Sequence, residues 1–186
     1  MSAGRPSVVG DDAGPVPPFP LRMEGKVISG FGRGSKELGI PTANLPVDES
    51  ATPWIASAKS GVYFGYASLL LGDSSPNFRV FPMVMSIGYN PFYKNTVRSA
   101  EVHVLHRFDA DFYGSHMRLL LLGFVREELD YTSLEALVAD INFDCEVARN
   151  SLARPGWAPR RGLVEGGGAV AAVDGTLDVD WLVQPL

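Results

Sequence analysis

Hydrophobic residues along the middle of the chain fall into blocks separated by clusters of glycine, proline, asparagine and serine. The first block, residues 25–31, predicts a strand that leads into a glycine-rich stretch. β-Branched and aromatic runs at 61–71 and 78–88, and a short two-residue alternation at 100–108, predict further strands. Residues 117–127 form an almost continuous apolar run, which predicts a strand buried on both faces.

One later segment repeats with the period of a helix. Its apolar side chains share one helical face, at Leu134, Leu137, Val138, Ile141, Cys145, Ala148 and Leu152. Thr132 and Glu135 form a capping-box pattern that makes Thr132 the expected N-cap, and Arg154-Pro155 ends the helix. Burying a leucine, valine or isoleucine contributes about 1.5–3 kcal/mol, so we expect this helix to pack on the sheet.

Five or six strands, one late helix and no alternation of strands with helices predict a mainly β fold. The expected arrangement is a closed antiparallel barrel with the amphipathic helix packed across it. Gly65 lies inside the 61–71 run, as glycines often do where barrel strands bend. Pro82 predicts an edge position or a bulge in the 78–88 strand, because proline cannot donate to a ladder.

Both ends of the chain lack these patterns. Residues 1–22 are rich in proline and show neither the helical nor the strand period, so we expect a flexible tail. Deleting residues 1–20 is expected to leave activity and melting temperature nearly unchanged. The folded domain is expected over 23–153. Residues 154–186 are expected to form a second tail, glycine-rich over 166–172, with a short edge strand at 176–183.

The composition fits one globular domain. The chain has 186 residues, 46% of them hydrophobic and 20% charged, with a net charge of −5 and a pI of about 5.2. This acidic balance argues against a general nucleic-acid or membrane-surface role. Cys145 is the single cysteine, so no internal disulfide can form, which suits a reducing compartment. No apolar run reaches the roughly 18 residues of a membrane span and no secretory signal is visible, so a cytoplasmic location is expected.

The stretch GFGRGSKELGIPTAN, residues 30–44, is the strongest candidate for chemistry. Glycine costs little at positive φ, so its N–H groups could point at an anion beside the charge of Lys36. The glycines placed for this are Gly30, Gly32 and Gly34. Known phosphate motifs do not fit, because a P-loop has Lys-Ser or Lys-Thr where this chain has Ile40-Pro41. From the residues alone, an ordinary turn between two strands is the commoner interpretation.

Thr42 and Asn44 add candidate metal ligands at the end of this stretch. They are two residues apart on an extended segment stiffened by Pro41, so their oxygens point to the same side. Neutral oxygens of this kind suit a Mg²⁺ ion that keeps some waters and takes its charge balance from substrate phosphates. A structural zinc site is not expected at His103 and His106, because the chain has one cysteine and no third histidine nearby.

Four stretches taken together resemble the signature of the riboflavin kinases. They are GFGRGSKELGIPTANLP, SGVYFGYASL, SIGYNPFYKN and EVHVLHRFDADFYG, and the likeness runs in order over residues 23–152. The resemblance implies the fold of that family, a closed six-stranded antiparallel Greek-key barrel. It also implies transfer of the γ-phosphoryl group of MgATP to the ribityl 5′-hydroxyl of riboflavin, giving FMN and ADP.

The resemblance also implies cofactors and partners. ATP is the expected co-substrate and Mg²⁺ the expected metal, with Zn²⁺ or Mn²⁺ as alternatives. Riboflavin, ATP, FMN and ADP are the expected ligands of a monomer that binds neither nucleic acid nor membrane. Relatives that also make FAD use an additional nucleotide-binding domain ahead of the barrel, and the residues before the first strand here are too few for one.

Residue roles are implied by matching each position to the family's motifs. Glu101 matches the catalytic glutamate, the base that receives the proton of the 5′-hydroxyl beside the flavin. Thr42 and Asn44 match the metal ligands, and Arg126 and Tyr131 match a flap that contacts the flavin ring. The nucleotide contacts match Gly30, Lys36, Thr42, Asn44, Val104, His106 and Tyr113, to which the glycine pattern adds Gly32 and Gly34.

Each role has a structural alternative that the residues leave open. A strand carboxylate such as Glu101 is more often solvent-facing. Tyr131 could be a staple residue just before the helix cap. Glu127 stands where relatives often have proline, which leaves the shape of the flap open. Barrel packing is the alternative role for Val104, His106 and Tyr113.

Two other classes of protein share parts of this pattern. A flavin-binding barrel that serves as a carrier or redox module would bind FMN without consuming ATP, and would not need Thr42, Asn44 and Glu101 together. An oligonucleotide-binding barrel would require a basic, aromatic face, for which the candidates are Lys94, Arg98, Tyr89, Phe92 and Tyr93. The acidic pI counts against the second class.

Overall fold

The computed structural model describes residues 4–29, 39–72, 77–89, 97–160 and 175–186, where six strands form one antiparallel sheet. The strands are β1 (Leu21–Lys26), β2 (Ala43–Leu45), β3 (Gly61–Leu70), β4 (Arg79–Tyr89), β5 (Arg98–Val104) and β6 (His116–Arg126). The α-helices are α1 (Leu134–Leu152) and α2 (Asp180–Val183), and the 3-10 helices are η1 (Pro53–Ala56) and η3 (Pro155–Trp157). The mainly β class and the late helix are confirmed.

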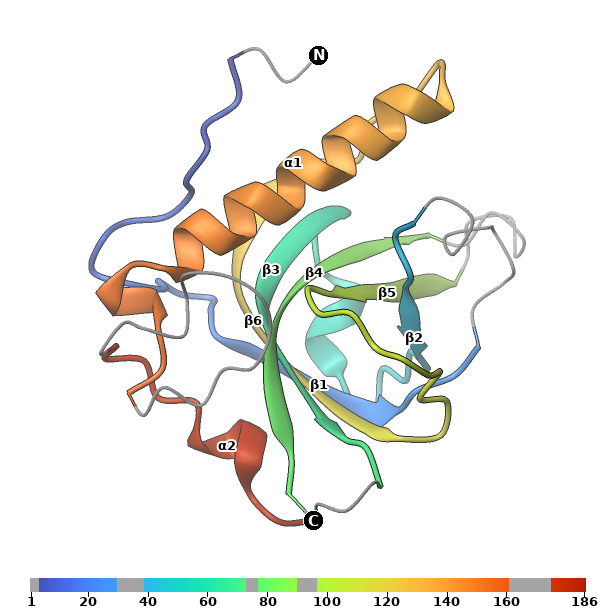
Figure 1. Ribbon diagram of the computed structural model, residues 1–186, viewed down its shortest axis with the longest axis vertical. Coiled ribbons are helices and arrows are strands. Elements are labelled where there is room, and N and C mark those ends of the chain that lie inside the picture. The colour runs from blue at the N-terminus through green and yellow to red at the C-terminus, as the bar shows by residue number, and fades with distance from the viewer. Residues whose placement is uncertain (1–3, 30–38, 73–76, 90–96, 161–174) are drawn as a thin grey trace.

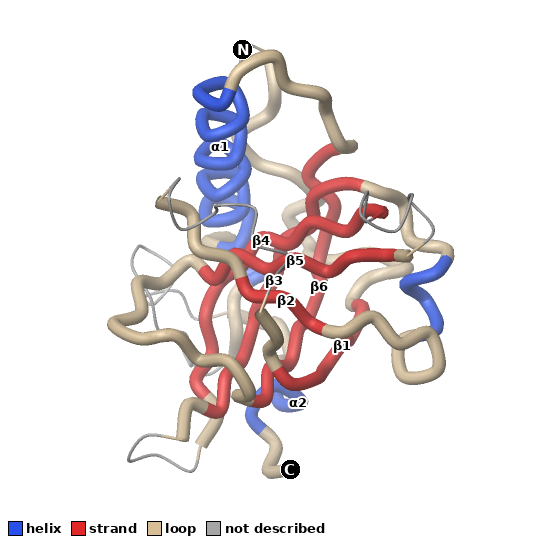
Figure 2. The backbone as a smooth tube through the Cα atoms, turned by 90° about the vertical axis from the view of Figure 1, so that its right-hand side faces the viewer, coloured by secondary structure: helices blue, strands red, loops and turns tan. Residues whose placement is uncertain are grey.

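The sheet curls into a half-barrel (Figure 1 and Figure 2). β3, β4 and β5 pair in sequence and β6 returns beside β3, which is a Greek-key connection. At the open side, the described residues of β1 and β2 form no ladder with each other, and Ile28, just after β1, makes only an isolated bridge to Asn44. The predicted closed barrel is therefore corrected to an open one. β2 has only three residues, all paired with β5, and is too short to build a second ladder.

The inner face of the sheet carries the larger core. Successive strand residues face opposite sides, so alternate residues of the strands point into it. Its buried members include Leu69, Phe81, Met83, Met85, Ile87, Val102, Leu119 and Leu121. This core fills the half-barrel.

The outer face of β3, β4 and β6 is buried as well, beneath α1 and the C-terminal segment (Figure 1). The side chains that meet there include Phe64, Tyr66, Leu120 and Leu122 from the sheet, and Cys145, Ala148, Leu152 and Trp157 from the covering segments. The phenol of Tyr66 donates a hydrogen bond to the carbonyl oxygen of Trp157 at 3.1 Å. Burial of β6 on both faces confirms the prediction made from its continuous apolar run.

The helix α1 begins one residue later than its capping-box pattern predicts. Ser133, in extended conformation, is the N-cap, and its hydroxyl oxygen accepts from the Ala136 N–H at 3.2 Å. Thr132 is therefore not the cap, and Glu135 stands at the second helical position instead of the third. Both residues of the pair Thr132–Ser133 are good N-caps, so the sequence alone does not decide between them. The helix ends at Leu152, as predicted.

Pro82 lies where β4 changes from an inner strand to an edge strand. Its partner on β3 is Tyr66, but the ladder with β5 begins only at Met83, opposite Val104. At this point β4 needs only a hydrogen-bond acceptor, because the Pro82 carbonyl oxygen accepts a hydrogen bond from the Leu105 N–H at 2.8 Å. The missing N–H of proline is therefore harmless here, as the predicted edge position requires.

Gly65 marks a change of register between β3 and β6. The pairing is irregular between Phe64 and Gly65, so the two strands approach each other unevenly. A Cβ atom at position 65 would overlap the backbone carbonyl oxygen of Leu120. Only glycine fits this close approach of two backbones.

The N-terminal segment is docked on the outside of α1 and η3 (Figure 1). The hydrogen bonds that hold it join Val9 N to Ser151 Oγ (3.0 Å), Trp157 Nε1 to Asp11 O (2.7 Å), and Arg154 Nη1 to Gly10 O and Asp12 Oδ1 (2.9 Å each). β1 then begins at residue 21. The flexible tail predicted for 1–22 is therefore wrong for residues 4–22. Most of the hydrogen bonds that hold this segment use its own backbone groups. The pattern of its side chains therefore gives no sign of them.

We expect removal of residues 1–14 to lower the melting temperature by several degrees. The deletion uncovers Trp157, which is only 2% exposed, and leaves Arg154 without its N-terminal acceptors. Melting followed by circular dichroism, with the full chain beside the truncated one, measures the effect. An unchanged midpoint would show that the docked segment adds nothing to stability.

The helix α2 stands where an edge strand was predicted over 176–183. Leu182 is buried in the outer core. The carbonyl oxygens of Trp181 and Gln184 accept from Arg118 at 3.1 and 2.6 Å. The strand prediction is wrong for residues 180–183, which are helical, whereas Leu177 makes an isolated parallel bridge to Pro159.

Three remaining expectations concern membrane-spanning segments, the single cysteine and the glycine-rich C-terminal stretch. Within the described ranges, the helices are too short or too polar to cross a bilayer. Cys145 is a free, buried cysteine, and burial raises the pKa of its thiol to about 11. The glycine-rich stretch 166–172 lies outside the described residues.

Candidate active site

Three side chains with predicted chemical roles gather on one face of the β2–β5 pair. Asn44 lies directly opposite Glu101 in the register. Their neighbours Ala43 and Val102 are buried in the inner core, so Asn44 and Glu101 project from the outer face. Thr42 precedes β2, and its hydroxyl donates to Glu101 Oε1 at 2.6 Å. The fold thus brings the predicted base close to both predicted metal ligands.

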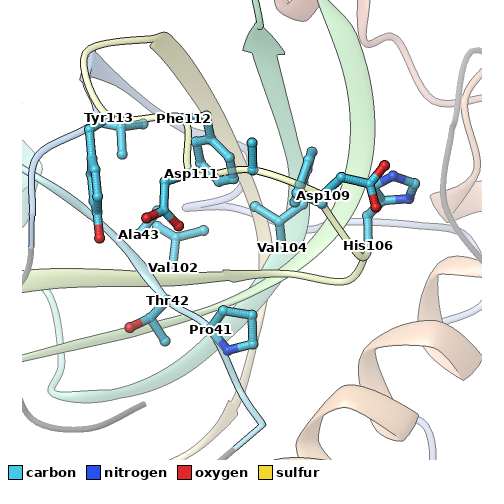
Figure 3. Close-up of a pocket in the computed structure, with 13 residues that line it drawn as sticks. Pro41, Thr42, Ala43, Val102, Val104, His106, Asp109, Asp111, Phe112 and Tyr113 are labelled. Carbon is cyan, nitrogen blue, oxygen red and sulfur yellow. The ribbon is translucent and has the colours of Figure 1, made fainter. Parts of the chain in front are cut away.

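A first cavity, here called the loop cavity, opens between the start of β2 and the loop 106–113, with a volume of about 410 Å³. Figure 3 shows Asp111 and Tyr113 extending from this loop toward the chain segment that carries Thr42. Its lining includes the predicted nucleotide-binding residues Thr42, Val104, His106 and Tyr113. Asn44 is absent from the residues that line it.

His106 both lines the loop cavity and packs within an aromatic cluster. Its ring centroid lies 4.8 Å from that of Phe81 and 4.8 Å from that of Phe108. Phe108 in turn contacts Phe112 edge to face, at 4.7 Å. These contacts fix the loop that forms one wall of the cavity. His106 therefore both packs against its aromatic neighbours and lines the loop cavity.

A second cavity, here called the helix cavity, lies between the outer face of the sheet and the first half of α1, with a volume of about 560 Å³. Its apolar lining includes Ile40, Val62, Val84, Leu134, Leu137 and Ile141. Its polar lining includes the three predicted flavin-binding residues, Glu101, Arg126 and Tyr131. The first half of the apolar helix face thus borders a cavity instead of packing on the sheet. Thr42 lines both cavities.

Arg126 and Tyr131 are held from behind by two carboxylates of α1. Arg126 donates through Nε to Asp144 at 3.0–3.1 Å and through Nη2 at 2.8 Å. The Tyr131 hydroxyl donates to Asp140 Oδ2 at 3.0 Å. Burial, followed by this hydrogen bond, raises the pKa of Tyr131 to about 12 against the opposing charge of Arg126, so the phenol stays neutral.

Tyr131 is therefore fixed by a polar contact, which goes beyond the staple role that its position before the helix suggests. The flap itself is fastened at Glu127, whose carboxylate pairs with Lys59 while its carbonyl oxygen accepts from Arg126 Nη1 at 3.0 Å. Both charged groups of the Lys59–Glu127 pair are well exposed, so the pair contributes little to stability.

His103 fastens the chain segment before Thr42. Its Nδ1 lies 2.7 Å from the carbonyl oxygen of Pro41, which can only accept, so Nδ1 carries the proton. Burial lowers the pKa of His103, despite the opposing effect of this hydrogen bond. The ring is therefore neutral near pH 7 and holds Pro41 and Thr42 against β5.

The residues present fit a metal that receives most of its charge from a ligand. Among the described residues, no group of three or more histidine, cysteine, aspartate or glutamate side chains could hold a metal ion. Thr42 and Asn44 offer neutral oxygens on the face that carries Glu101. Such a donor set suits Mg²⁺ bound together with phosphates.

Several predicted residues lie outside the described part of the chain. They are Gly30, Gly32, Gly34 and Lys36, and, from the candidate oligonucleotide face, Phe92, Tyr93 and Lys94. Arg98 is described and buried: it donates to Ser60 Oγ at 2.8 Å and to the Ala58 carbonyl, with its guanidinium over the Tyr89 ring. The charge of Arg98 is therefore engaged by contacts within the fold and is not available to bind a phosphate backbone.

Sequence reasoning missed the carboxylates Asp140 and Asp144. Both are buried on α1, and Asp144 lines the helix cavity. A signal was present, because they fall one turn apart next to the apolar stripe of Ile141 and Cys145. Charged residues inside such a stripe seldom stay buried unless they are paired.

The fold and the site together define a class of protein. It is a Greek-key half-barrel with two cavities that share Thr42, whose hydroxyl donates to Glu101, an arrangement suited to moving a group between two ligands. The family model that matches residues 17–152 is described as Flavokinase: Riboflavin kinase.

Curated relatives and a solved structure agree. The riboflavin kinase of Pyricularia oryzae is 62% identical over 194 residues, covering 100% of this chain and 97% of that protein. That of Chaetomium globosum is 57% identical over 220 residues, covering 97% and 94%. The crystal structure of riboflavin kinase from Trypanosoma brucei is similar with a TM-score of 0.61 and 28% identity, over 75% of this chain and 84% of that one. The chain belongs to the riboflavin kinase family.

Proposed function

We propose that this chain transfers the γ-phosphoryl group of ATP to the ribityl 5′-hydroxyl of riboflavin at Thr42 and Glu101, where its two cavities meet. The observation that carries this assignment is the position of Thr42, which lines both cavities and donates to Glu101. Phosphoryl transfer needs two ligands held in line with little covalent help from the protein. Two cavities that share one residue supply that geometry.

Riboflavin is assigned to the helix cavity. Its apolar walls from β3, β4 and α1 suit a flat ring system, and its lining also includes polar groups. Arg126 and Tyr131, each anchored to a buried aspartate, offer fixed polar contacts to the ring. The ribityl chain then extends toward Glu101.

The nucleotide is assigned to the loop cavity. Val104 and His106 give it an apolar and aromatic wall, and Tyr113 reaches toward Thr42 from the opposite side. The phosphates are placed toward Thr42, next to the glycine-rich residues that precede it in the chain.

Glu101 is proposed as the base. One of its carboxylate oxygens accepts from Thr42, which orients the carboxylate and leaves the other oxygen for the 5′-hydroxyl. Proton removal in the transition state by a positioned carboxylate contributes about 10²–10⁴-fold in rate. His103 supports this geometry indirectly by holding Pro41 against β5.

Mg²⁺ is the proposed metal, with Thr42 and Asn44 as its protein ligands. When bound, such an ion neutralises the charge of the transferring phosphoryl group. Because both protein ligands are neutral, the nucleotide phosphates supply the negative charge that offsets the cost of removing water from the metal ion.

We expect Thr42→Val and Asn44→Leu to raise the Mg²⁺ concentration needed for turnover. Each should weaken ADP binding only when metal is present, because the side chain acts on the ion. Calorimetric titration of ADP in Mg²⁺ and in EDTA measures this, together with FMN formation from riboflavin and ATP. Thr176→Val, at an exposed threonine that lines neither cavity, is the matched control. Equal weakening in both buffers would mean that the residues touch the nucleotide itself.

The two other classes are less well supported. A carrier barrel would have no use for a base beside a second cavity, and it would leave ATP unchanged when incubated with riboflavin. An oligonucleotide-binding barrel would need free basic groups, whereas Arg98 is engaged within the fold. Formation of FMN and ADP in that incubation separates the kinase from both.

A further inference from the structure

The two buried carboxylates behind the helix cavity have a third partner, from the start of the chain. Arg5 donates through Nη2 to Asp144, and its Nη1 lies 3.5 Å from Asp140 Oδ1. Its guanidinium also lies over the Phe143 ring, 4.9 Å from the centroid. A residue more than a hundred positions away in the sequence therefore contacts both aspartates behind the predicted flavin site.

The charges of this cluster balance only when Arg5 is present. Two carboxylates one turn apart on α1 are almost completely removed from water. Within the described residues, the cations that contact them are Arg126 and Arg5. A buried charge that loses its partner is strongly unfavourable, so without Arg5 one guanidinium would serve both carboxylates.

The groups facing the cavity depend on that balance. Arg126 meets both oxygens of Asp144, a geometry that fixes its plane and direction. Tyr131 is fixed through Asp140 in the same way. If the guanidinium of Arg126 had to pair with both aspartates, it would change position, and so would the Tyr131 ring beside it.

We propose that Arg5 is a positioning residue for the helix cavity, fixing the two carboxylates that orient Arg126 and Tyr131. This inference rests on the proposed placement of riboflavin in that cavity. The docked N-terminal segment is then more than a stabilising strap, because its first anchored side chain sets the affinity for one of the two substrates.

The test compares Arg5→Ala with the wild-type chain by flavin-fluorescence titration of riboflavin and by steady-state kinetics. Losing a hydrogen-bonded charge from the network is expected to raise the Kd and KM for riboflavin about 10-fold. The KM for ATP and the kcat are expected to change by less than about twofold, because the loop cavity and Glu101 are not touched.

Two further variants separate positioning from simple docking. Ser151→Ala removes the bond to Val9 N, which anchors the same segment to the same helix without touching the carboxylates. It should lower the melting temperature and leave the KM for riboflavin unchanged. Arg5→Lys keeps the charge but not the planar fork, so an intermediate affinity is expected. Equal loss of riboflavin affinity in the alanine variants at 5 and 151, or a lysine variant no better than alanine, would overturn the proposal.

Arg126→Ala distinguishes this proposal from the placement of riboflavin itself. If that variant binds riboflavin normally, the flavin is not in the helix cavity and the assignment of the substrate fails. If it weakens riboflavin while Arg5→Ala does not, the placement stands and the role of Arg5 is wrong. Circular dichroism of each variant confirms that the comparison is made on folded protein.

Discussion

Replacing Glu101 with glutamine is expected to lower kcat by at least about 10²-fold, while the fold and both substrate affinities are kept. The amide oxygen of glutamine still accepts from the Thr42 hydroxyl, so the side chain stays in place. What is lost is the carboxylate proposed to take the proton of the 5′-hydroxyl. Single-turnover measurement of FMN formation, with calorimetry for each substrate, reports the two effects separately.

The control for this variant is Glu146→Gln, which removes the same charge from the exposed side of α1. It should leave kcat unchanged. A well-folded Glu101→Gln enzyme with near-normal turnover would remove Glu101 from the mechanism and leave its bond to Thr42 as a purely structural contact.

Gly65→Ala is expected to cause a large loss of stability. The added methyl group meets a backbone carbonyl oxygen of β6 and not a flexible side chain, so two strands have to move apart. Overpacking of this kind costs about 1–3 kcal/mol, and more where backbone must shift. Urea unfolding, with the midpoint and slope fitted for both proteins, gives the difference.

Gly25→Ala is the matched control for this substitution. Gly25 lies in β1, and a Cβ atom there would come no closer than 3.7 Å to Pro46, which is ordinary contact. Its midpoint should stay close to that of the wild-type chain. If the two alanine variants unfold at the same urea concentration, the close approach at Gly65 is relieved at no cost.

β3, β4, β5 and β6 were predictable because each carries its own local signal, whereas the first strand was predicted at 25–31 and β1 lies at Leu21–Lys26. The apolar runs at 61–71 and 117–127 correspond to β3 and β6, and Pro82 marks the point where pairing of β4 with β5 stops. Whether the sheet closes was not predictable, since that depends on the length of β2 and on how the two edges meet. β2 has only three paired residues, which is too short a segment to show a two-residue period in the sequence.

The site was predictable as far as its residues stand on strands or in recognisable motifs. Two-residue spacing places Thr42 and Asn44 on one side, and the structure adds Glu101 across the register. Propensity alone could not say that Thr42 lines two cavities, because a cavity arises from elements far apart in sequence.

Arg5 shows most clearly what local reasoning leaves out. A proline-rich segment without apolar period looks like a tail, and no property of the segment itself indicates a partner. The signal lies at the other end of the contact, in two aspartates placed where an amphipathic helix should be apolar. Buried charges imply an unseen cation, and that rule could have directed attention to the beginning of the chain.

β3, β4 and β6 belong to both hydrophobic cores at once, and this has a consequence for cooperativity. Each of these strands contributes one set of side chains to the half-barrel and the other set to the layer beneath α1. Neither layer keeps its apolar contacts if the shared strands separate, so neither can act as an independent folding unit. The chain is therefore expected to unfold in a single transition, and a helix residue that never reaches the inner core still helps to hold β4, and with it the paired strand β5, in place.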